Sequence, residues 1–178
     1  MIRICVFCGA SAGQDPVYAE AAGALGRELA ARSIEVVTGG GKVGLMGVVA
    51  DAALEAGGRV IGIIPRFLVE REAAHRGLSE LHVVETLHER KALMHELSDA
   101  FIALPGGFGT LDELTESVTW AQLGLHAKPI GLVNVAGYFD DLLAFVTAAA
   151  GEGFVSGSHG ELLTARSDVQ TLLDALLR

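Results

Sequence analysis

Hydrophobic and polar positions along this chain follow two alternating patterns. Short runs of β-branched or apolar residues end at glycine or proline, and each run is followed by an amphipathic stretch of helical length. Strands are predicted at residues 2–7, 34–38, 59–64, 81–85, 100–104 and 129–134. Helices are predicted at residues 16–32, 44–56, 87–97, 111–125 and 138–149, with Ser167 as the N-cap of a last helix that reaches Leu173 or beyond. The alternation predicts an α/β fold, a Rossmann-like doubly wound parallel sheet with helices on both faces.

Length and composition agree with one globular domain. The chain has 178 residues, of which 51% are hydrophobic, and a mean hydropathy of +0.44. A chain of this length buries roughly 70% of its unfolded surface, so we expect a single domain spanning residues 1–178. No window approaches the ~18 uninterrupted apolar residues of a membrane span, and the N-terminus shows no basic leader or cleavage site. We therefore expect a cytoplasmic protein without a membrane partner.

The charge balance bears on the choice of ligand. A formal net charge of −9 and a pI near 5.0 repel polyanions such as DNA, and no run of five or more basic residues offsets that repulsion. Nucleic acid is therefore not expected as a partner. A small phosphorylated ligand is compatible with this charge, because a few local cations and helix N-termini can bind one phosphate in an acidic protein.

Cys5 and Cys8 have the spacing of a redox-active CxxC pair. That chemistry requires the first cysteine at a helix N-terminus, whereas Cys5 falls within a predicted strand and would point to the opposite face from Cys8. Both are better interpreted as small buried apolar residues. A metal site is not predicted either, because His88 and His95 lie two helical turns apart, about 10 Å, too far to share one ion.

Three glycine-rich segments follow predicted strands. Residues 9–13, 39–44 and 105–110 come after the first, second and fifth strands. In a doubly wound sheet the ligand lies at the carboxyl ends of the strands, where loops lead into helix N-termini. The three segments therefore predict a nucleotide-sized site on one edge of the sheet.

The second of these segments, GGGKVG at residues 39–44, contains the GxGxxG pattern of dinucleotide-binding proteins. The acidic residue that binds the ribose in such proteins is missing about twenty positions later, where residues 59–65 read RVIGIIP. A P-loop is excluded because the lysine is followed by valine rather than serine or threonine. Two interpretations remain: a tight turn with positive φ and close helix packing, or contact with a mononucleotide through Gly39, Gly40 and Gly41.

Residues 104–113, LPGGFGTLDE, combine a strand end, a flexible turn and a helix start. The amides of the glycines, the Thr110 hydroxyl and the helix dipole could together bind a phosphate. Thr110 and Glu113 also fit a capping box, in which each side chain bonds a backbone amide of the other residue and no chemistry follows. The spacing alone does not decide between the two.

Arg90 favours a ligand site. Leu87, Arg90, Met94 and Leu97 are spaced +3, +4 and +3, so they lie along one stripe of the predicted helix. Arg90 thus interrupts a surface that otherwise has a buried pattern, and a guanidinium in such a place needs an anionic partner. It could form an internal salt bridge, or Arg90 and Glu113 could meet across a site with a substrate between them.

At these residues the sequence resembles a known family. Residues 87–91 (LHERK), followed by residues 105–113 (PGGFGTLDE), closely resemble the LONELY GUY family of cytokinin riboside 5'-monophosphate phosphoribohydrolases. The flanking segments CGASAG, GGGKVGLMG, VIGIIP, TWAQLG and KPIG are also similar. Leu87 and Asp112 are mild departures, because many members have methionine and glutamate at these positions.

The resemblance implies hydrolysis of the N-glycosidic bond of adenosine or N6-substituted adenosine 5'-monophosphate. That reaction releases the free base and ribose 5-phosphate, and the family needs no metal or organic cofactor. The resemblance also implies that Arg90 and Glu113 are the catalytic pair. Implied substrate-binding positions are Lys91, Gly107, Phe108, Gly109, Thr110, Leu111, Asp112 and Thr119. Glu72 matches less closely, because the loop at residues 66–79 varies in length among relatives.

A homodimer with active sites near the subunit contact is a further implication of the resemblance. The helix predicted at residues 111–125 carries apolar residues on more than one face, namely Val118, Trp120, Leu123 and Leu125. This pattern suits burial against both the sheet and a partner, although an ordinary two-sided core helix has the same pattern.

Two alternative functions stand beside the hydrolase. Lysine decarboxylase, an older label on such sequences, needs pyridoxal phosphate on a Schiff-base lysine, and the surroundings of Lys42, Lys91 and Lys128 do not resemble such a cofactor site. A non-catalytic purine-nucleotide sensor is the other alternative, and the presence of both Arg90 and Glu113 favours the enzyme. The sequence leaves open whether AMP or an N6-modified nucleotide is preferred.

Overall fold

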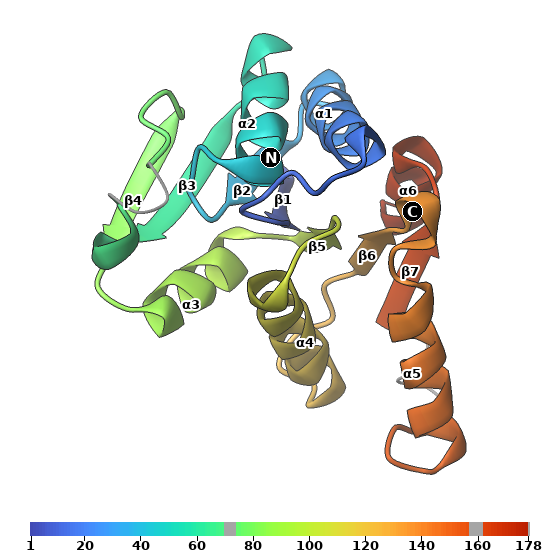
Figure 1. The fold of residues 1–178 in the computed structure, drawn as a ribbon. Coiled ribbons are helices and arrows are strands. Elements are labelled where there is room, and N and C mark those ends of the chain that lie inside the picture. The colour runs from blue at the N-terminus through green and yellow to red at the C-terminus, as the bar shows by residue number, and fades with distance from the viewer. Residues whose placement is uncertain (70–73, 157–161, 178) are drawn as a thin grey trace.

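The computed structural model describes residues 1–69, 74–156 and 162–177 and centres on a parallel β-sheet (Figure 1). Its strands are β1 (Arg3–Phe7), β2 (Glu35–Thr38), β3 (Val60–Pro65), β4 (Glu80–Val84), β5 (Ala100–Ala103), β6 (Ile130–Val133) and β7 (Leu163–Arg166). Its α-helices are α1 (Pro16–Ala31), α2 (Gly44–Glu55), α3 (Leu87–Leu97), α4 (Phe108–Gln122), α5 (Asp140–Gly151) and α6 (Val169–Leu176). Short 3-10 turns, η1 (Arg66–Leu68) and η2 (Val135–Gly137), follow β3 and β6. The predicted strands and helices are confirmed, with ends shifted by a few residues.

β7 is a strand that the sequence pattern did not predict. It pairs in parallel with β6 at one edge of the sheet, from Ile130↔Leu163 to Val133↔Arg166. Its residues, LTAR, are half-buried at three positions and exposed at the fourth. A strand this short, without strict alternation of apolar and polar positions, gives no strong periodic pattern to detect.

Two helix starts differ from the sequence-based predictions. Asp168, not Ser167, caps α6: its backbone is extended and its carboxylate accepts a hydrogen bond of 2.9 Å from the amide of Thr171. α5 begins at Asp140 rather than Tyr138, because Ala136 and Gly137 both have positive φ, 52° and 71°, and turn the chain before the helix begins.

The order of the strands is β4-β3-β2-β1-β5-β6-β7, and all neighbouring pairs are parallel. The chain therefore runs outwards from β1 to β4, returns to the centre, and continues through β5 to β7. The two directions diverge between β1 and β5, whose last paired residues are Phe7 and Ala103. In doubly wound sheets the ligand binds outside the carboxyl ends of the strands at such a switch point.

Two apolar clusters pack against opposite faces of the sheet, so the doubly wound Rossmann-like fold is confirmed (Figure 1). One cluster joins the sheet to α1, α2 and α6, and the other joins it to α3, α4 and α5. β1 shows why both form: Ile4 and Val6 point into the first cluster, whereas Cys5 and Phe7 point into the second. In the described part of the chain, no helix has the length and apolar character needed to cross a membrane.

Candidate active site

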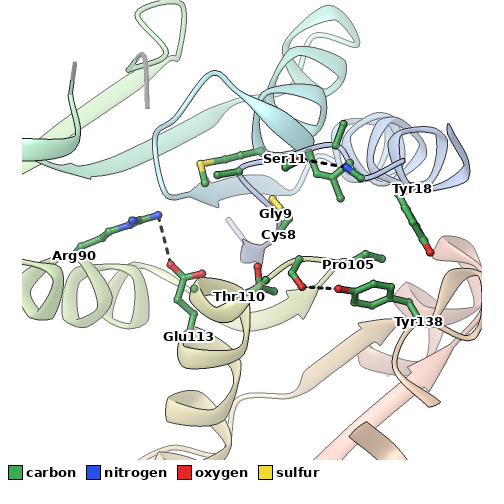
Figure 2. Close-up of a pocket in the computed structure, with 17 residues that line it drawn as sticks. Cys8, Gly9, Ser11, Tyr18, Arg90, Pro105, Thr110, Glu113 and Tyr138 are labelled. Atoms are coloured by element: carbon green, nitrogen blue, oxygen red, sulfur yellow. Dashed lines mark hydrogen bonds and ion pairs between the residues drawn. The ribbon is translucent and has the colours of Figure 1, made fainter. Parts of the chain in front are cut away.

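A cavity of about 630 Å³ opens at the carboxyl ends of β1 and β5, within the usual size range of small-ligand sites (Figure 2). The loop after β1 and the loop after β5 form most of its wall, and they are joined by a hydrogen bond of 3.0 Å from the Gly9 amide to the Pro105 carbonyl. The first turn of α2 and Arg90 of α3 complete one side. The cavity thus occupies the switch point of the sheet.

Arg90 and Glu113 meet at one end of this cavity. Nη2 of Arg90 lies 3.5 Å from Oε1 of Glu113, and their side chains are 8% and 13% exposed (Figure 2). Arg90 Nε is buried without a hydrogen-bond partner among the described residues. The structure therefore brings the predicted pair into an ion pair at the cavity wall, and it leaves part of the guanidinium available to a ligand.

The start of α4 forms the middle of the cavity wall. Gly107 is the N-cap and makes no side-chain capping bond, so the first amides of the helix have no side-chain acceptor from the cap residue. The Thr110 hydroxyl is buried and has no hydrogen-bond partner among the described residues. Unpaired donors at a helix N-terminus are a ready anion-binding site.

The capping-box interpretation of Thr110 and Glu113 is wrong. It required the helix to begin at Leu111, with Thr110 as the cap, whereas α4 begins at Phe108 and Thr110 lies inside its first turn. Gly106 makes room for Thr110 in this first turn, because a Cβ on Gly106 would overlap Oγ1 of Thr110. Thr110 therefore does not have the capping role that its spacing from Glu113 suggested.

The glycines of residues 39–44 support the packing interpretation. Gly40 and Gly44 have positive φ, 77° and 64°, and a Cβ on Gly44 would overlap the backbone of Ala10 in the loop after β1. Gly39, Gly40 and Gly41 are not among the residues that line the cavity. They lie behind the site, where Gly39 makes room for the guanidinium of Arg90.

Lys91 holds α3 against α4 instead of lining the cavity. Its Nζ donates hydrogen bonds to Asp112, at 3.0 Å, and to Glu116, at 2.8 Å. Burial would lower the pKa of Lys91, but the bonds to Glu116 and Asp112 outweigh it and raise that pKa. Lys91 and Asp112, both predicted to bind substrate, thus bind each other beside the Arg90–Glu113 ion pair.

Only some of the other predicted binding positions lie at the cavity. Gly107, Gly109 and Thr110 line the cavity, whereas Phe108, Leu111 and Thr119 do not. Phe108 is 92% exposed, and the Thr119 hydroxyl donates to the carbonyl of Thr115 within its own helix. Glu72 lies outside the described residues.

A second link between α3 and α4 lies one turn beyond the Arg90–Glu113 ion pair. Oγ of Ser117 donates to the Glu113 carbonyl at 2.9 Å and lies 2.9 Å from Nε2 of His95, which assigns the imidazole proton to Nε2. Burial lowers the pKa of His95 to about 4, and the charges of His126, Lys128 and Lys91 act in the same direction. His95 is therefore a neutral hydrogen-bonding link at pH 7.

Cys5 and Cys8 are free, buried and on opposite faces of the sheet, as predicted. Burial raises the pKa of both thiols, and the Glu113 carboxylate raises them further. Cys8 lines the cavity, but as a protonated thiol it contributes apolar surface rather than a nucleophile.

Sequence reasoning missed several residues of the cavity wall. They are Ser11, Tyr18, Leu45, Met46 and Tyr138. The apolar ones have the same sequence pattern as core residues, and Tyr138 lies in a segment predicted as helix. Ser11 had a signal in the sequence, because it lies in a glycine-rich segment directly after a predicted strand.

The fold and the cavity define a Rossmann-like α/β protein with a ligand-sized cavity at the switch point of its sheet. A family model described as "Possible lysine decarboxylase" matches residues 46–176. The chain is 51% identical to the probable cytokinin riboside 5'-monophosphate phosphoribohydrolase LOGL9 of Oryza sativa subsp. japonica, over 98% of this chain and 77% of the relative. It is 50% identical to cytokinin riboside 5'-monophosphate phosphoribohydrolase LOG3 of Arabidopsis thaliana, over 98% of this chain and 81% of the relative. The chain belongs to this LOG family.

Solved structures support the fold independently. The Moco carrier protein from Chlamydomonas reinhardtii superposes with a TM-score of 0.75 at 22% identity, covering 99% of this chain and 95% of that one. The molybdenum cofactor binding protein from Rippkaea orientalis superposes with a TM-score of 0.73 at 23% identity, covering 99% and 98%. At such low identity the similarity establishes the architecture alone.

Proposed function

We propose that residues 1–178 form one hydrolase domain that cleaves the N-glycosidic bond of adenosine or N6-substituted adenosine 5'-monophosphate, giving the free base and ribose 5-phosphate. One observation carries the proposal: the Arg90–Glu113 pair lines the same cavity as the Thr110 hydroxyl, which has no hydrogen-bond partner in the part of the chain that the structure describes. The helix start suits the phosphate end of a ribose 5-phosphate, and the carboxylate beside it suits the C1' end. Relatives about half identical to this chain bear the name of this activity.

The carboxylate of Glu113 has the role that the chemistry demands. Breaking the bond moves positive charge onto C1' and the ring oxygen of the ribose, while the electron pair of the bond leaves with the base. Glu113 stabilises that cation or orients the water that adds to C1'. Arg90 holds Glu113 through their ion pair and directs its remaining N–H groups towards the ribose hydroxyls or the departing base.

The start of α4 supplies binding energy away from the bond that breaks. The amides of Gly107 and Gly109 and the Thr110 hydroxyl hold the 5'-phosphate, and α4 itself carries Glu113 one turn further on. Phosphate binding therefore aligns the sugar against the catalytic carboxylate. A nucleoside without the phosphate should lose turnover as well as affinity.

Pyridoxal phosphate chemistry, which the description of the matching family model suggests, does not fit this site. A Schiff base needs a lysine facing the cavity, and none of Lys42, Lys91 and Lys128 lines it. Lys91 is bonded to two carboxylates, and Lys128 donates to the His95 carbonyl at 2.6 Å. No step of the mechanism passes through that cofactor.

Release of free base from nucleotides tests the proposal directly. AMP, isopentenyl-AMP, GMP and CMP are incubated separately with the protein, and the base is quantified by chromatography. We expect release from the two adenine nucleotides, and release slower by roughly 10² or more with the Glu113→Gln variant. Tight binding of AMP without any release would show a nucleotide sensor, and absence of both would remove the proposal.

We also infer that the active form is a homodimer. Phe108 at the start of α4 and Leu123 and Leu125 just after its end are large apolar residues, with exposures of 92%, 69% and 67%. Exposed apolar residues at both ends of α4 support a partner surface along this helix, whose first turns line the cavity.

A further inference from the structure

Two tyrosines form the end of the cavity opposite Arg90 and Glu113 (Figure 2). Tyr18 comes from α1 and Tyr138 from the turn before α5, and their rings meet edge to face with centroids 5.5 Å apart. Tyr18 lies against Gly13 in the loop after β1, where a Cβ would come within 2.8 Å of its ring. Tyr138 donates a hydrogen bond of 2.7 Å to the Gly106 carbonyl in the loop after β5. The pair thus spans both loops of the cavity.

Tyr138 is held firmly in this position. Ala136, just before it, has φ 52° and ψ 24°, a left-handed conformation that residues other than glycine rarely adopt. Asn134 supports the turn: its Oδ1 accepts from the Phe139 amide and its Nδ2 donates to Asp140, both at 2.7 Å. Phe139 is buried in the core. Strain that is kept at the edge of a ligand cavity points to a functional position.

The direction of the bound nucleotide follows from the proposed function. In that function Glu113 faces C1' and the start of α4 binds the 5'-phosphate. Thr110, in the first turn of α4, lies between Glu113 and the two tyrosines (Figure 2). A second phosphoryl group would extend from the first one away from the sugar, and hence towards Tyr138 and Tyr18.

The lack of positive charge at the tyrosine end of the cavity, in the part of the chain that the structure describes, also disfavours a second phosphoryl group. Arg90 is the one cationic residue among the described residues that line the cavity, and it lies at the far end beside Glu113. The wall next to Gly106 consists of aromatic rings and small residues. A second phosphoryl group there would therefore gain no cationic partner from the described lining residues.

We propose that Tyr138, braced by Tyr18, restricts the substrate to one phosphate group, and so determines selectivity for nucleoside monophosphates over diphosphates and triphosphates. This inference rests on the proposed function, because that function sets the orientation of the nucleotide. Tyr138 acts here through the volume of its ring. Its hydroxyl has the separate role of holding the Gly106 carbonyl beside the phosphate site.

Steady-state hydrolysis of AMP and ADP by four proteins tests the proposal. They are the wild type, Tyr138→Ala, Tyr138→Phe and Phe145→Ala, the last being an exposed aromatic residue of α5 outside the cavity. We expect Tyr138→Ala to narrow the ratio of kcat/KM for AMP over ADP by about tenfold or more, mainly through a lower KM for ADP. Tyr138→Phe keeps the ring and should keep the ratio, and Phe145→Ala should match the wild type.

Equal losses on AMP and ADP in Tyr138→Ala would overturn the proposal, because a general structural defect acts on both nucleotides. Relaxed selectivity in Tyr138→Phe would overturn it as well, since the ring would then not be the determinant. If Tyr138→Ala does not fold, Tyr18→Ala, which removes the brace from α1, must relax the same ratio.

A binding experiment separates this inference from the proposed function. Calorimetric titration of Glu113→Gln with AMP and ADP needs no hydrolysis, and the same variant carrying Tyr138→Ala should bind ADP more tightly relative to AMP. If the wild type releases no adenine but this shift occurs, the hydrolase proposal fails and the selectivity inference stands. If adenine is released and the shift is absent, the hydrolase proposal stands and the selectivity inference fails.

Discussion

Gly39 lies directly behind the guanidinium of Arg90. A Cβ at Gly39 would overlap Nη2 of Arg90 and come within 2.8 Å of its Cζ, so a side chain there would displace the guanidinium. Gly39 follows the last residue of β2, whereas Arg90 lies in α3, so packing between the sheet and the helix creates this contact. The position of Arg90 beside Glu113 therefore depends on the absence of a side chain at a residue that does not line the cavity.

Gly39→Ala should lower kcat by roughly 10² or more, as loss of the Arg90 group itself would, because the guanidinium is pushed away from Glu113. The measurement is base release from AMP under saturating substrate. Gly151→Ala in α5 is the matched control, because its Cβ would meet open space. That control should keep full activity and stabilise the protein by about 0.5–1 kcal/mol. Unchanged kcat in Gly39→Ala would show that Arg90 tolerates displacement.

Glu113→Gln and Arg90→Ala should each lower turnover by roughly 10² or more while the protein stays folded. Glu113 does not form the capping box that was considered from the sequence, so its loss removes no helix cap. Turnover is measured per folded molecule, with folding followed by circular dichroism. Normal specific activity in a destabilised Glu113→Gln would assign a structural role to this carboxylate.

Thr110→Val should stabilise the free protein and weaken nucleotide binding. The Thr110 hydroxyl is buried without a partner among the described residues, so replacing it with a methyl group removes a desolvation cost of about 1 kcal/mol. The same change removes a donor to the phosphate, and affinity for AMP should fall about tenfold, which is about 1.4 kcal/mol. Thermal unfolding with and without AMP measures both effects.

Thr115→Val is the control for Thr110→Val. Its hydroxyl is exposed and donates to the Leu111 carbonyl, so neither stability in the presence of AMP nor affinity should change much. Lower stability of free Thr110→Val would mean that the hydroxyl already has a partner in the folded protein.

His95 should make the protein less stable at mildly acidic pH. Burial holds the pKa of His95 at about 4, below its ordinary value of 6.5, so the unfolded chain binds this proton more tightly than the folded protein does. Its contribution is complete above pH 6.5 and is lost as the pH falls towards 4, by about 2 kcal/mol between pH 7.5 and pH 5.

Urea unfolding of the wild type and His95→Phe at several pH values measures this effect. Phenylalanine suits the site, because the His95 ring lies 4.5 Å from that of Phe101 and 4.4 Å from that of Trp120. The variant should lose less stability than the wild type between pH 7.5 and pH 5. Parallel curves for the two proteins would show that folding does not shift the pKa of His95.

Leu123→Asp should weaken the proposed homodimer. A charge at this exposed apolar position cannot be buried against a partner without a large desolvation cost. Sedimentation at micromolar concentration should show a dimer for the wild type and more monomer for the variant. Phe154→Asp, at a residue 83% exposed after α5, is the control and should remain dimeric. A wild-type monomer would remove the prediction.

Local patterns in the sequence predicted most of the strands and helices of the fold. Alternating apolar periods located six strands and six helices, and the glycine-rich segments after the first and fifth strands indicated where the cavity lies. These features are local, because strand and helix periods and turn residues act over a few positions. Arg90 and Glu113 could be chosen for the same reason: each is a charged group at a conspicuous place in its own helix.

Contacts between distant segments were decided by the tertiary structure. The family resemblance implies that Lys91 binds substrate, yet the packing of α3 on α4 directs it to Asp112 and Glu116. Tyr138 joins the cavity because a left-handed turn at Ala136 aims it at the loop after β5, 32 positions earlier in the chain. The sequence by itself determined the elements and the chemically capable residues. Which of those residues face one another depended on side-chain packing across the sheet, which no local pattern encodes.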